Sequence, residues 1–197
     1  PAGAAPAPPM ADVMAGEFAL QQGDLATAAR YYLLAAQQSD DAGLAERATR
    51  IALVAGQDDS ASGAIARWRA LAPDSVAMHA AAIRLALDQG EHETAMDSAR
   101  VLLALPAEAG FAPFLAALSE ARGDEAVIAR SVMGEVFAQS LLPANLSAWL
   151  RFSGLARRLG DPGLAGRVLS AGQARFPDDP RVQLLEASRL RSEGQRV

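Results

Sequence analysis

A glycine that ends one helix and precedes an acidic residue or glutamine recurs along this chain at nearly constant spacing. It stands at Gly23, Gly56, Gly90, Gly123, Gly160 and Gly194. The intervals are 33, 34, 33, 37 and 34 residues. Glycine adopts the left-handed conformation needed just past a helix end, and an acidic residue suits the positive N-terminus of the next helix. The series therefore predicts consecutive helical hairpins, each about 34 residues long.

A second series of helix-breaking residues falls between these hairpins with nearly the same period. It comprises Asp40-Asp41, Pro73-Asp74, Pro106, Pro143 and Pro177-Asp178. Proline stops a helix because it lacks the N–H group and crowds the preceding turn. Hydrophobic residues make up 51% of the chain but aromatics only 5%, and alanine, the best helix former, fills much of the difference. Runs of β-branched and aromatic residues are absent, so the sequence predicts an all-α fold.

The period and the helix–turn–helix pattern resemble the tetratricopeptide repeat (TPR). The first hairpin carries matching small and large residues at Gly16, Ala19, Ala28, Tyr32 and Ala35, and the fifth at Trp149, Ser153, Ala156, Ala165, Leu169 and Gly172. We expect the small residues to allow close helix contact, and Tyr32, Trp149 and Leu169 to fill the space between hairpins. The resemblance implies a TPR-like α-α superhelix, a solenoid of antiparallel helical hairpins.

Three hairpins depart from the TPR pattern. Trp68 stands where the pattern has alanine, and Ile83 where it has the glycine of close contact. The fourth hairpin has Ile128 and Val132 in its second helix and about three extra residues before Pro143. We therefore expect different packing at Trp68 and a local change of superhelical pitch at the fourth hairpin.

The two ends of the chain differ from the repeats. Residues 1–10 are mostly Pro and Ala and are expected to form a flexible linker, either a trimmed tail or a tether that follows a removed signal or lipid anchor. Residues 11–197 are expected to form a repeat domain of about five and a half units. Residues 181–193 predict one more helix, which Gly194 ends. That helix is either a solvating cap or, as we favour, a sign that the chain is the N-terminal part of a longer array.

Composition argues against several classes of function. The net charge is −5 and no stripe of Lys and Arg is present, so nucleic acid and anionic lipid are unexpected partners. No apolar run reaches membrane-spanning length, and cysteine is absent, which excludes thiol chemistry and disulfides. We expect no direct membrane insertion by this segment.

Catalytic and metal motifs also fail on inspection. His79 and His92 are the only histidines, and the second histidine of a metalloprotease motif would fall at Met96. His92 is expected to be exposed, and His79 is expected at the surface or at a packing edge. A calcium loop starting at Asp58 would need a glutamate where Arg69 stands. The sequence therefore predicts no catalytic residues, no metal site and no cofactor.

Stacked hairpins place their first helices along a concave groove, which is where a partner would bind. The register of the glycines selects candidate groove residues: Glu17, Leu20, Glu46, Arg50, Leu53, Arg84, Leu87, Glu120, Leu150, Arg157, Leu184, Ser188 and Arg191. Leucines could bury apolar groups of a polypeptide, and arginines could bind its carboxylates through bidentate hydrogen bonds. The alternative for any single residue is an ordinary solvated helix face. The partner is expected to be another protein or a peptide. The Lys and Asn clamp of chaperone-tail-binding TPR domains is not expected, because Asn145 is the only asparagine.

The segment AERATRIAL, residues 45–53, follows Gly16-Glu17-Phe18-Ala19-Leu20 and the Tyr31-Tyr32 helix. Over residues 14–73 this part resembles proteobacterial TPR lipoproteins of the outer membrane that serve as adaptors for carboxyl-terminal processing proteases. The resemblance implies a periplasmic adaptor that binds such a protease and its cell-wall hydrolase substrates; a cytoplasmic location is the alternative. The lipid-accepting cysteine and the signal peptide of that family are missing from this sequence. The alternative function is a structural or oligomerising TPR module of a cell-envelope export or assembly complex.

Overall fold

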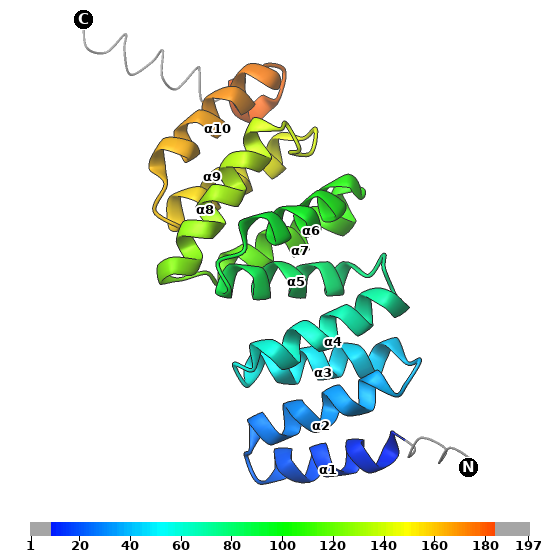
Figure 1. Ribbon diagram of the computed structural model, residues 1–197. Helices are drawn as coiled ribbons and strands as arrows, with labels where there is room; N and C mark the ends of the chain where they lie inside the picture. The colour runs from blue at the N-terminus through cyan, green and yellow to red at the C-terminus, as the bar shows by residue number, and fades with distance from the viewer. Residues whose placement is uncertain (1–8, 184–197) are drawn as a thin grey trace, which may run out of the picture. The chain divides into compact units, whose positions relative to one another are not determined.

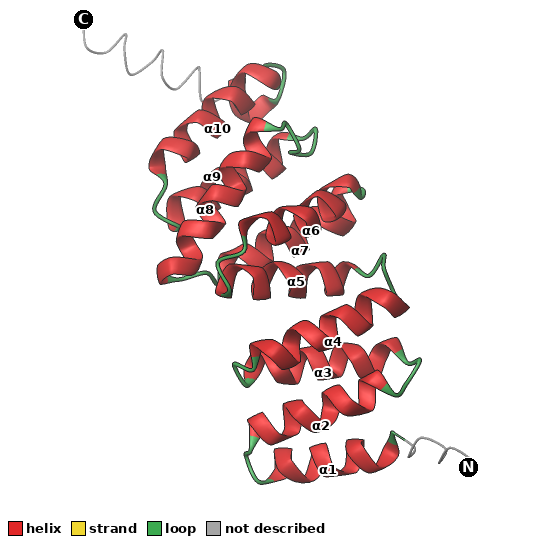
Figure 2. Cartoon of the chain, in the orientation of Figure 1, coloured by secondary structure: helices red, strands yellow, loops and turns green. Residues whose placement is uncertain are grey.

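The computed structural model describes residues 9–183, and within them it contains helices, turns and loops but no strand (Figures 1 and 2). The helices are α1 (Met10–Gln21), α2 (Leu25–Gln37), α3 (Ala42–Val54), α4 (Asp58–Leu71), α5 (Val76–Asp88), α6 (His92–Ala104), α7 (Ala107–Ser119), α8 (Gly123–Ala138), α9 (Leu146–Arg158) and α10 (Pro162–Arg175). Each odd-numbered helix and the helix after it form one hairpin. The all-α prediction and the TPR-like hairpins are confirmed over the described residues.

The glycine series marks the turn inside each described hairpin. The φ angles are positive at Gly23 (76°), Gly56 (61°), Gly90 (73°), Gly123 (51°) and Gly160 (85°). In the first and fifth hairpins the acidic residue that follows caps the second helix: Asp24 accepts from Thr27 N at 3.0 Å and Asp161 from Leu164 N at 2.8 Å. The sequence rule is therefore confirmed at five of its six positions, and the sixth, Gly194, lies outside the described residues.

The breakers fall after the second helix of each hairpin, as predicted. The extra residues of the fourth hairpin lie in the loop after this second helix. α8 ends at Ala138, 15 residues after Gly123, just as α4 ends 15 residues after Gly56, but seven residues (139–145) separate α8 from α9 and only four (72–75) separate α4 from α5. A further helix begins at residues 180–183, and the remainder of the predicted helix 181–193 lies outside the described residues. The expected change of pitch stays a prediction.

The chain divides into two compact units, residues Pro1–Leu102 and Leu103–Val197. We call them unit 1 and unit 2 and describe each by itself. Unit 1 holds α1 to α5 and most of α6, and unit 2 holds α7 to α10.

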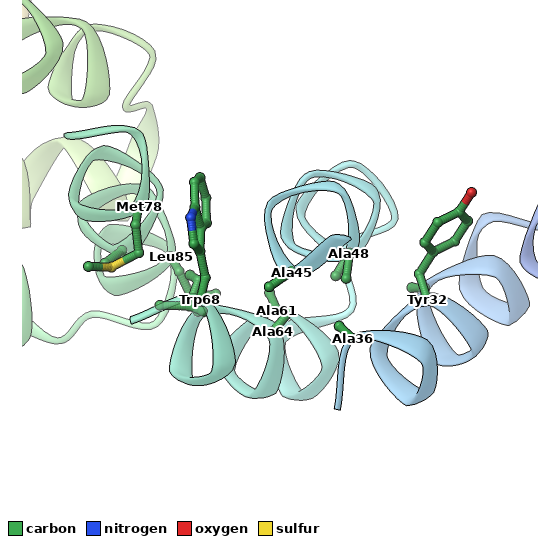
Figure 3. Close-up of a cluster of buried hydrophobic side chains, with 13 residues drawn as sticks. Tyr32, Ala36, Ala45, Ala48, Ala61, Ala64, Trp68, Met78 and Leu85 are labelled. Carbon is green, nitrogen blue, oxygen red and sulfur yellow. The ribbon is translucent and has the colours of Figure 1, made fainter. Parts of the chain in front are cut away.

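The core of unit 1 is built largely from alanine (Figure 3). Ala36, Ala45, Ala48, Ala61 and Ala64 have no exposed surface, and they lie where α2, α3 and α4 pack together. Alanine at these positions lets helices approach closely, since no long side chain separates them. The packing of the unit thus follows from the alanine-rich composition.

Larger side chains fill the two ends of this cluster. Trp68 is 4% exposed and extends from α4 toward Met78 and Leu85 of α5 (Figure 3). Tyr32 lies at the opposite end and is completely buried. Trp68 therefore packs in the core at a position where the TPR pattern has alanine, and Ile83, at the position of the close-contact glycine, is also completely buried.

The close contact predicted within the first hairpin is present. A Cβ atom added to Gly16 of α1 would lie 2.7 Å from Cδ2 of Tyr32 on α2, so only glycine fits there. In the fifth hairpin a Cβ on Gly172 of α10 would lie 3.3 Å from Cε3 of Trp149 on α9. Leu169 is half-buried, whereas its neighbour Val168 is completely buried.

An indole and an imidazole occupy corresponding positions in two hairpins. Nε1 of Trp149 donates to the carbonyl oxygen of Pro143 at 2.9 Å, and Nε2 of His79 lies 2.9 Å from the carbonyl oxygen of Pro73. Both side chains lie six residues after the proline that they contact. His79 is only 7% exposed, so of its two expected places, the surface or a packing edge, the surface is excluded. A buried imidazole that donates to a main-chain carbonyl has a packing role. His92 is half-buried rather than exposed.

Candidate protein-binding groove

The predicted residue Glu17 is already occupied by contacts within unit 1. Its carboxylate accepts a hydrogen bond from the hydroxyl of Tyr32 and pairs with the guanidinium of Arg47. The same guanidinium lies over the Tyr32 ring, 4.9 Å from its centroid. Burial and the hydrogen bond to Glu17 raise the pKa of Tyr32 to about 12. This network joins α1, α2 and α3, so Glu17 stabilises the fold as it stands.

The other candidates of unit 1 divide into exposed and covered residues. Glu46, Arg50 and Arg84 are exposed, as a groove requires. Leu20 and Leu53 are half-buried and pack against the alanine-rich core. Leu87 is only 3% exposed, so its prediction as a groove residue is wrong. A leucine on the first helix of a hairpin faces the core when neighbouring helices cover it, and the sequence register alone does not distinguish the two cases.

A groove lies in unit 2 between the first helices of its two hairpins, α7 and α9. Its volume is about 410 Å³. The lining residues are spaced at i, i+3, i+4 and i+7 on both helices: Ala112, Leu115, Ala116 and Ser119 on α7, and Arg151, Gly154, Leu155 and Arg158 on α9. This spacing selects a single face of each helix. We call this hollow the α7–α9 groove.

A second hollow of about 420 Å³ continues the α7–α9 groove, since Ser119 and Arg158 line both. Ala121, Arg122, Gly123, Ala126 and Leu159 complete its lining. Arg151 lines the first hollow, Arg122 lines the second, and Arg158 lines both.

The sequence prediction missed this face of α9 by one residue. It selected Leu150 and Arg157, whereas Arg151 and Arg158 line the groove. Leu150 is half-buried, and Arg157 is exposed outside both hollows. Glu120 is exposed and lies just beyond the end of α7. The predicted residues Leu184, Ser188 and Arg191 lie outside the described residues.

Counting from the glycines caused this error. Gly160 follows the last residue of α9 by two positions, whereas Gly123 follows the last residue of α7 by four. Successive residues of a helix point 100° apart, so one residue of error moves a side chain off the groove face. Two arginines seven residues apart lie on one face of a helix, and this spacing, with a glycine between them on the same face, is the local signal that indicates Arg151, Gly154 and Arg158.

Two of the three arginines that line the hollows have contacts within unit 2. The guanidinium carbon of Arg151 lies 5.9 Å from the ring centroid of Phe111 on α7. Nη1 of Arg122 donates to the carbonyl oxygens of Ala121 at 2.9 Å and Ser119 at 3.3 Å. Among residues 9–183, neither Arg151 nor Arg158 pairs with a carboxylate, so both can donate hydrogen bonds to a carboxylate of a ligand.

The groove has the chemistry of a binding surface. Leu115 and Leu155 form an apolar floor and are 7% and 2% exposed. The hydroxyl of Ser119 donates to the carbonyl oxygen of Ala116 at 2.9 Å, and neither histidine lines the groove. Such a lining can bury apolar groups and bind anions, but it offers no nucleophile paired with a base.

Comparisons with known proteins concern the fold. No protein-family model and no curated protein matches this sequence. Two crystal structures of MamA each match with a TM-score of 0.47 and 12% identity, covering 88% and 84% of this chain and 94% and 96% of theirs. The TPR domain of P58(IPK) matches with a TM-score of 0.39 and 18% identity, covering 96% of this chain and 68% of that domain. The assignment to TPR-like hairpins rests on the helices, turns and contacts described above.

Proposed function

We propose that this chain is a non-catalytic scaffold that binds a polypeptide segment of another protein in the α7–α9 groove. The observation that carries the proposal is the continuous hollow between two first helices, with an apolar floor and a polar rim. Leucine side chains on the floor would bury apolar groups of the ligand, while the rim would fix its orientation. Among the described residues no helix is both long and apolar enough to cross a membrane.

Groove binding can be tested by filling the groove. A Cβ on Gly154 would meet nothing within 4 Å, so Gly154→Trp starts a large side chain from an open position on the groove face. Gly166→Trp is the matched control, because Gly166 on α10 is equally open and lines neither hollow. A displayed library of random twelve-residue peptides is selected against the wild type and both variants. We expect enrichment on the wild type and on Gly166→Trp but not on Gly154→Trp. Equal enrichment on all three proteins would contradict groove binding.

For the natural role, we propose a periplasmic adaptor, tethered to the outer membrane in a full-length bacterial lipoprotein, that brings substrates to a carboxyl-terminal processing protease. The resemblance of residues 45–53 supports this role. In that segment Ala45, Ala48 and Ala52 are buried in the core, while Glu46 and Arg50 are exposed on α3 and available to a partner.

Copurification with a carboxyl-terminal processing protease tests the adaptor role. We expect the wild type to retain the protease and Glu46→Ala/Arg50→Ala to release it. Failure of the wild type to retain the protease would contradict this role and leave the groove proposal standing. Fractionation of cells that make the full-length protein tests its location.

A second candidate function is the structural or oligomerising module. Met10, Met14 and Phe18 are 63%, 66% and 62% exposed, and their spacing of four residues places them on one side of α1. Large exposed apolar patches mark association surfaces. Light scattering over a range of concentrations distinguishes the two functions. Self-association of the wild type that Met14→Glu/Phe18→Glu abolishes would favour the oligomerising module, and a wild type that stays monomeric would contradict it.

A further inference from the structure

We propose that the α7–α9 groove selects an acidic peptide, with two carboxylates about 10 Å apart and small or apolar side chains between them. This inference rests on the proposed function and specifies the chemistry of its ligand. Its evidence is the placement of the arginines relative to the apolar floor.

The spacing of two arginines defines the ligand. Arg151 and Arg158 are seven residues apart on α9, which corresponds to about 10.5 Å along a helix axis. In an extended polyproline-type peptide, residues i and i+3 point to the same side and are about 9.3 Å apart. Glutamates at these positions could each meet one guanidinium. Arginine suits this role because its planar fork binds both oxygens of a carboxylate.

Arg122 supports the same choice of ligand. Main-chain carbonyl oxygens of Ser119 and Ala121 hold its Nη1 beside the second hollow. Arg158 lines the same hollow, so two arginine side chains border it. A carboxylate on a segment that continues from the first hollow into the second would be attracted by both charges.

The floor limits what can lie between the carboxylates. Ala112, Ala116 and Gly154 have little or no side chain, and Leu115 and Leu155 are almost completely buried. Small residues such as alanine and proline on the ligand would cover these groups without displacing the arginines.

Nucleic acid is the competing anionic polymer, and the groove suits it poorly. Single-stranded nucleic acids bind through bases stacked on aromatic rings. No aromatic side chain lines either hollow, and the chain as a whole has a net charge of −5. The local chemistry therefore favours an acidic peptide.

Fluorescence anisotropy with labelled peptides tests the proposal on the whole chain. The first peptide carries Glu-Pro-Ala-Glu in an Ala and Pro background, the second carries Gln in place of both Glu, and an oligothymidine competes with them. We expect the Glu peptide to bind at least about tenfold tighter than the Gln peptide, with affinity that falls as salt rises. Equal affinity for the two peptides, or tighter binding of the oligothymidine, would overturn the proposal.

Two neighbouring arginines provide a matched pair of variants. Arg157 and Arg158 both lie exposed in the last turn of α9, but only Arg158 lines the hollows. We expect Arg158→Glu and Arg151→Glu each to lower the affinity for the Glu peptide at least about tenfold. Arg157→Glu should lower this affinity less than about threefold. Circular dichroism confirms that each variant is folded. Equal losses in Arg157→Glu and Arg158→Glu would overturn the assignment.

The peptide library separates failure of this inference from failure of the proposed function. If the enriched peptides lack acidic residues but are enriched on the wild type and not on Gly154→Trp, the proposed function stands and the acidic specificity is overturned. A library that yields no peptide on the wild type would overturn both.

Discussion

The contact between Gly16 and Tyr32 predicts that a single methyl group destabilises unit 1. In Gly16→Ala the new Cβ would lie 2.7 and 2.8 Å from Cδ2 and Cε2 of the tyrosine ring, where ordinary contacts are 3.4 to 4 Å. The ring must therefore shift by about 0.7 Å to restore the shortest ordinary contact. It has little freedom to do so, because it is completely buried, its hydroxyl bonds to Glu17 and the Arg47 guanidinium covers its face.

Two opposing effects set how much Gly16→Ala changes the free energy of unfolding. Overpacking a well-packed site costs about 1–3 kcal/mol, and the restrained ring places this site near the upper end. Alanine in place of glycine within a helix stabilises the folded state by about 1 kcal/mol, because alanine has the higher helix propensity. We expect Gly16→Ala to lower the free energy of unfolding by about 2 kcal/mol. Gly166→Ala is the control: no atom lies within 4 Å of its added Cβ, so it should raise the free energy of unfolding by up to about 1 kcal/mol.

Urea unfolding followed by circular dichroism at the helical band measures both variants. If steric conflict with the ring is the cause, Gly16→Ala should cost much less in a Tyr32→Leu background than in the wild type. A Gly16→Ala variant as stable as the wild type, or the same loss in both backgrounds, would refute the argument.

Three further variants test contacts in both units. The pKa of Tyr32 is raised to about 12, so its neutral hydroxyl stabilises the folded wild type below about pH 10. We expect the wild type to lose about 2–3 kcal/mol of unfolding free energy as pH rises toward 12, and Tyr32→Phe not to show this loss. Unfolding of both proteins across that range would detect it, and parallel pH profiles would argue against it. Trp149→Phe should cost about 0.5–1.5 kcal/mol in urea unfolding, because its bond to the carbonyl of Pro143 is lost while a ring remains; an unchanged midpoint would contradict this. Arg67→Met should lower the free energy of unfolding by about 1 kcal/mol, because the guanidinium of Arg67 donates to the main-chain carbonyl of Ser39 at 2.6 and 3.2 Å. High salt should not produce the same loss in the wild type, because the ion-pair partner Asp40 is 97% exposed and contributes little.

Much of the fold could be predicted because its signals are local. Gly23 and Gly160 adopt positive φ next to helix ends, and Asp24 and Asp161 cap the helices that follow. These features depend on a few neighbouring residues, so they can be read from sequence. Contacts between helices were predictable where a glycine faces a large ring, as Gly16 faces Tyr32.

The site was less predictable, because exposure depends on what covers a residue. Leu87 occupies a position on a first helix that suits a groove, yet it is buried. Glu17 meets Tyr32 and Arg47 from two other helices, and nothing in its local sequence indicates that network.

The sequence by itself determined where each described hairpin turns and ends, since the conformational freedom of glycine and the missing N–H of proline act at the residue that carries them. Only the tertiary structure decided which face of each helix is open. Arg158 lines the groove and Arg157 does not, although they are neighbours of the same type on the same helix. The physical reason is that neighbouring residues of a helix point 100° apart, so the packing of α7 against α9 decides which arginine lines the groove.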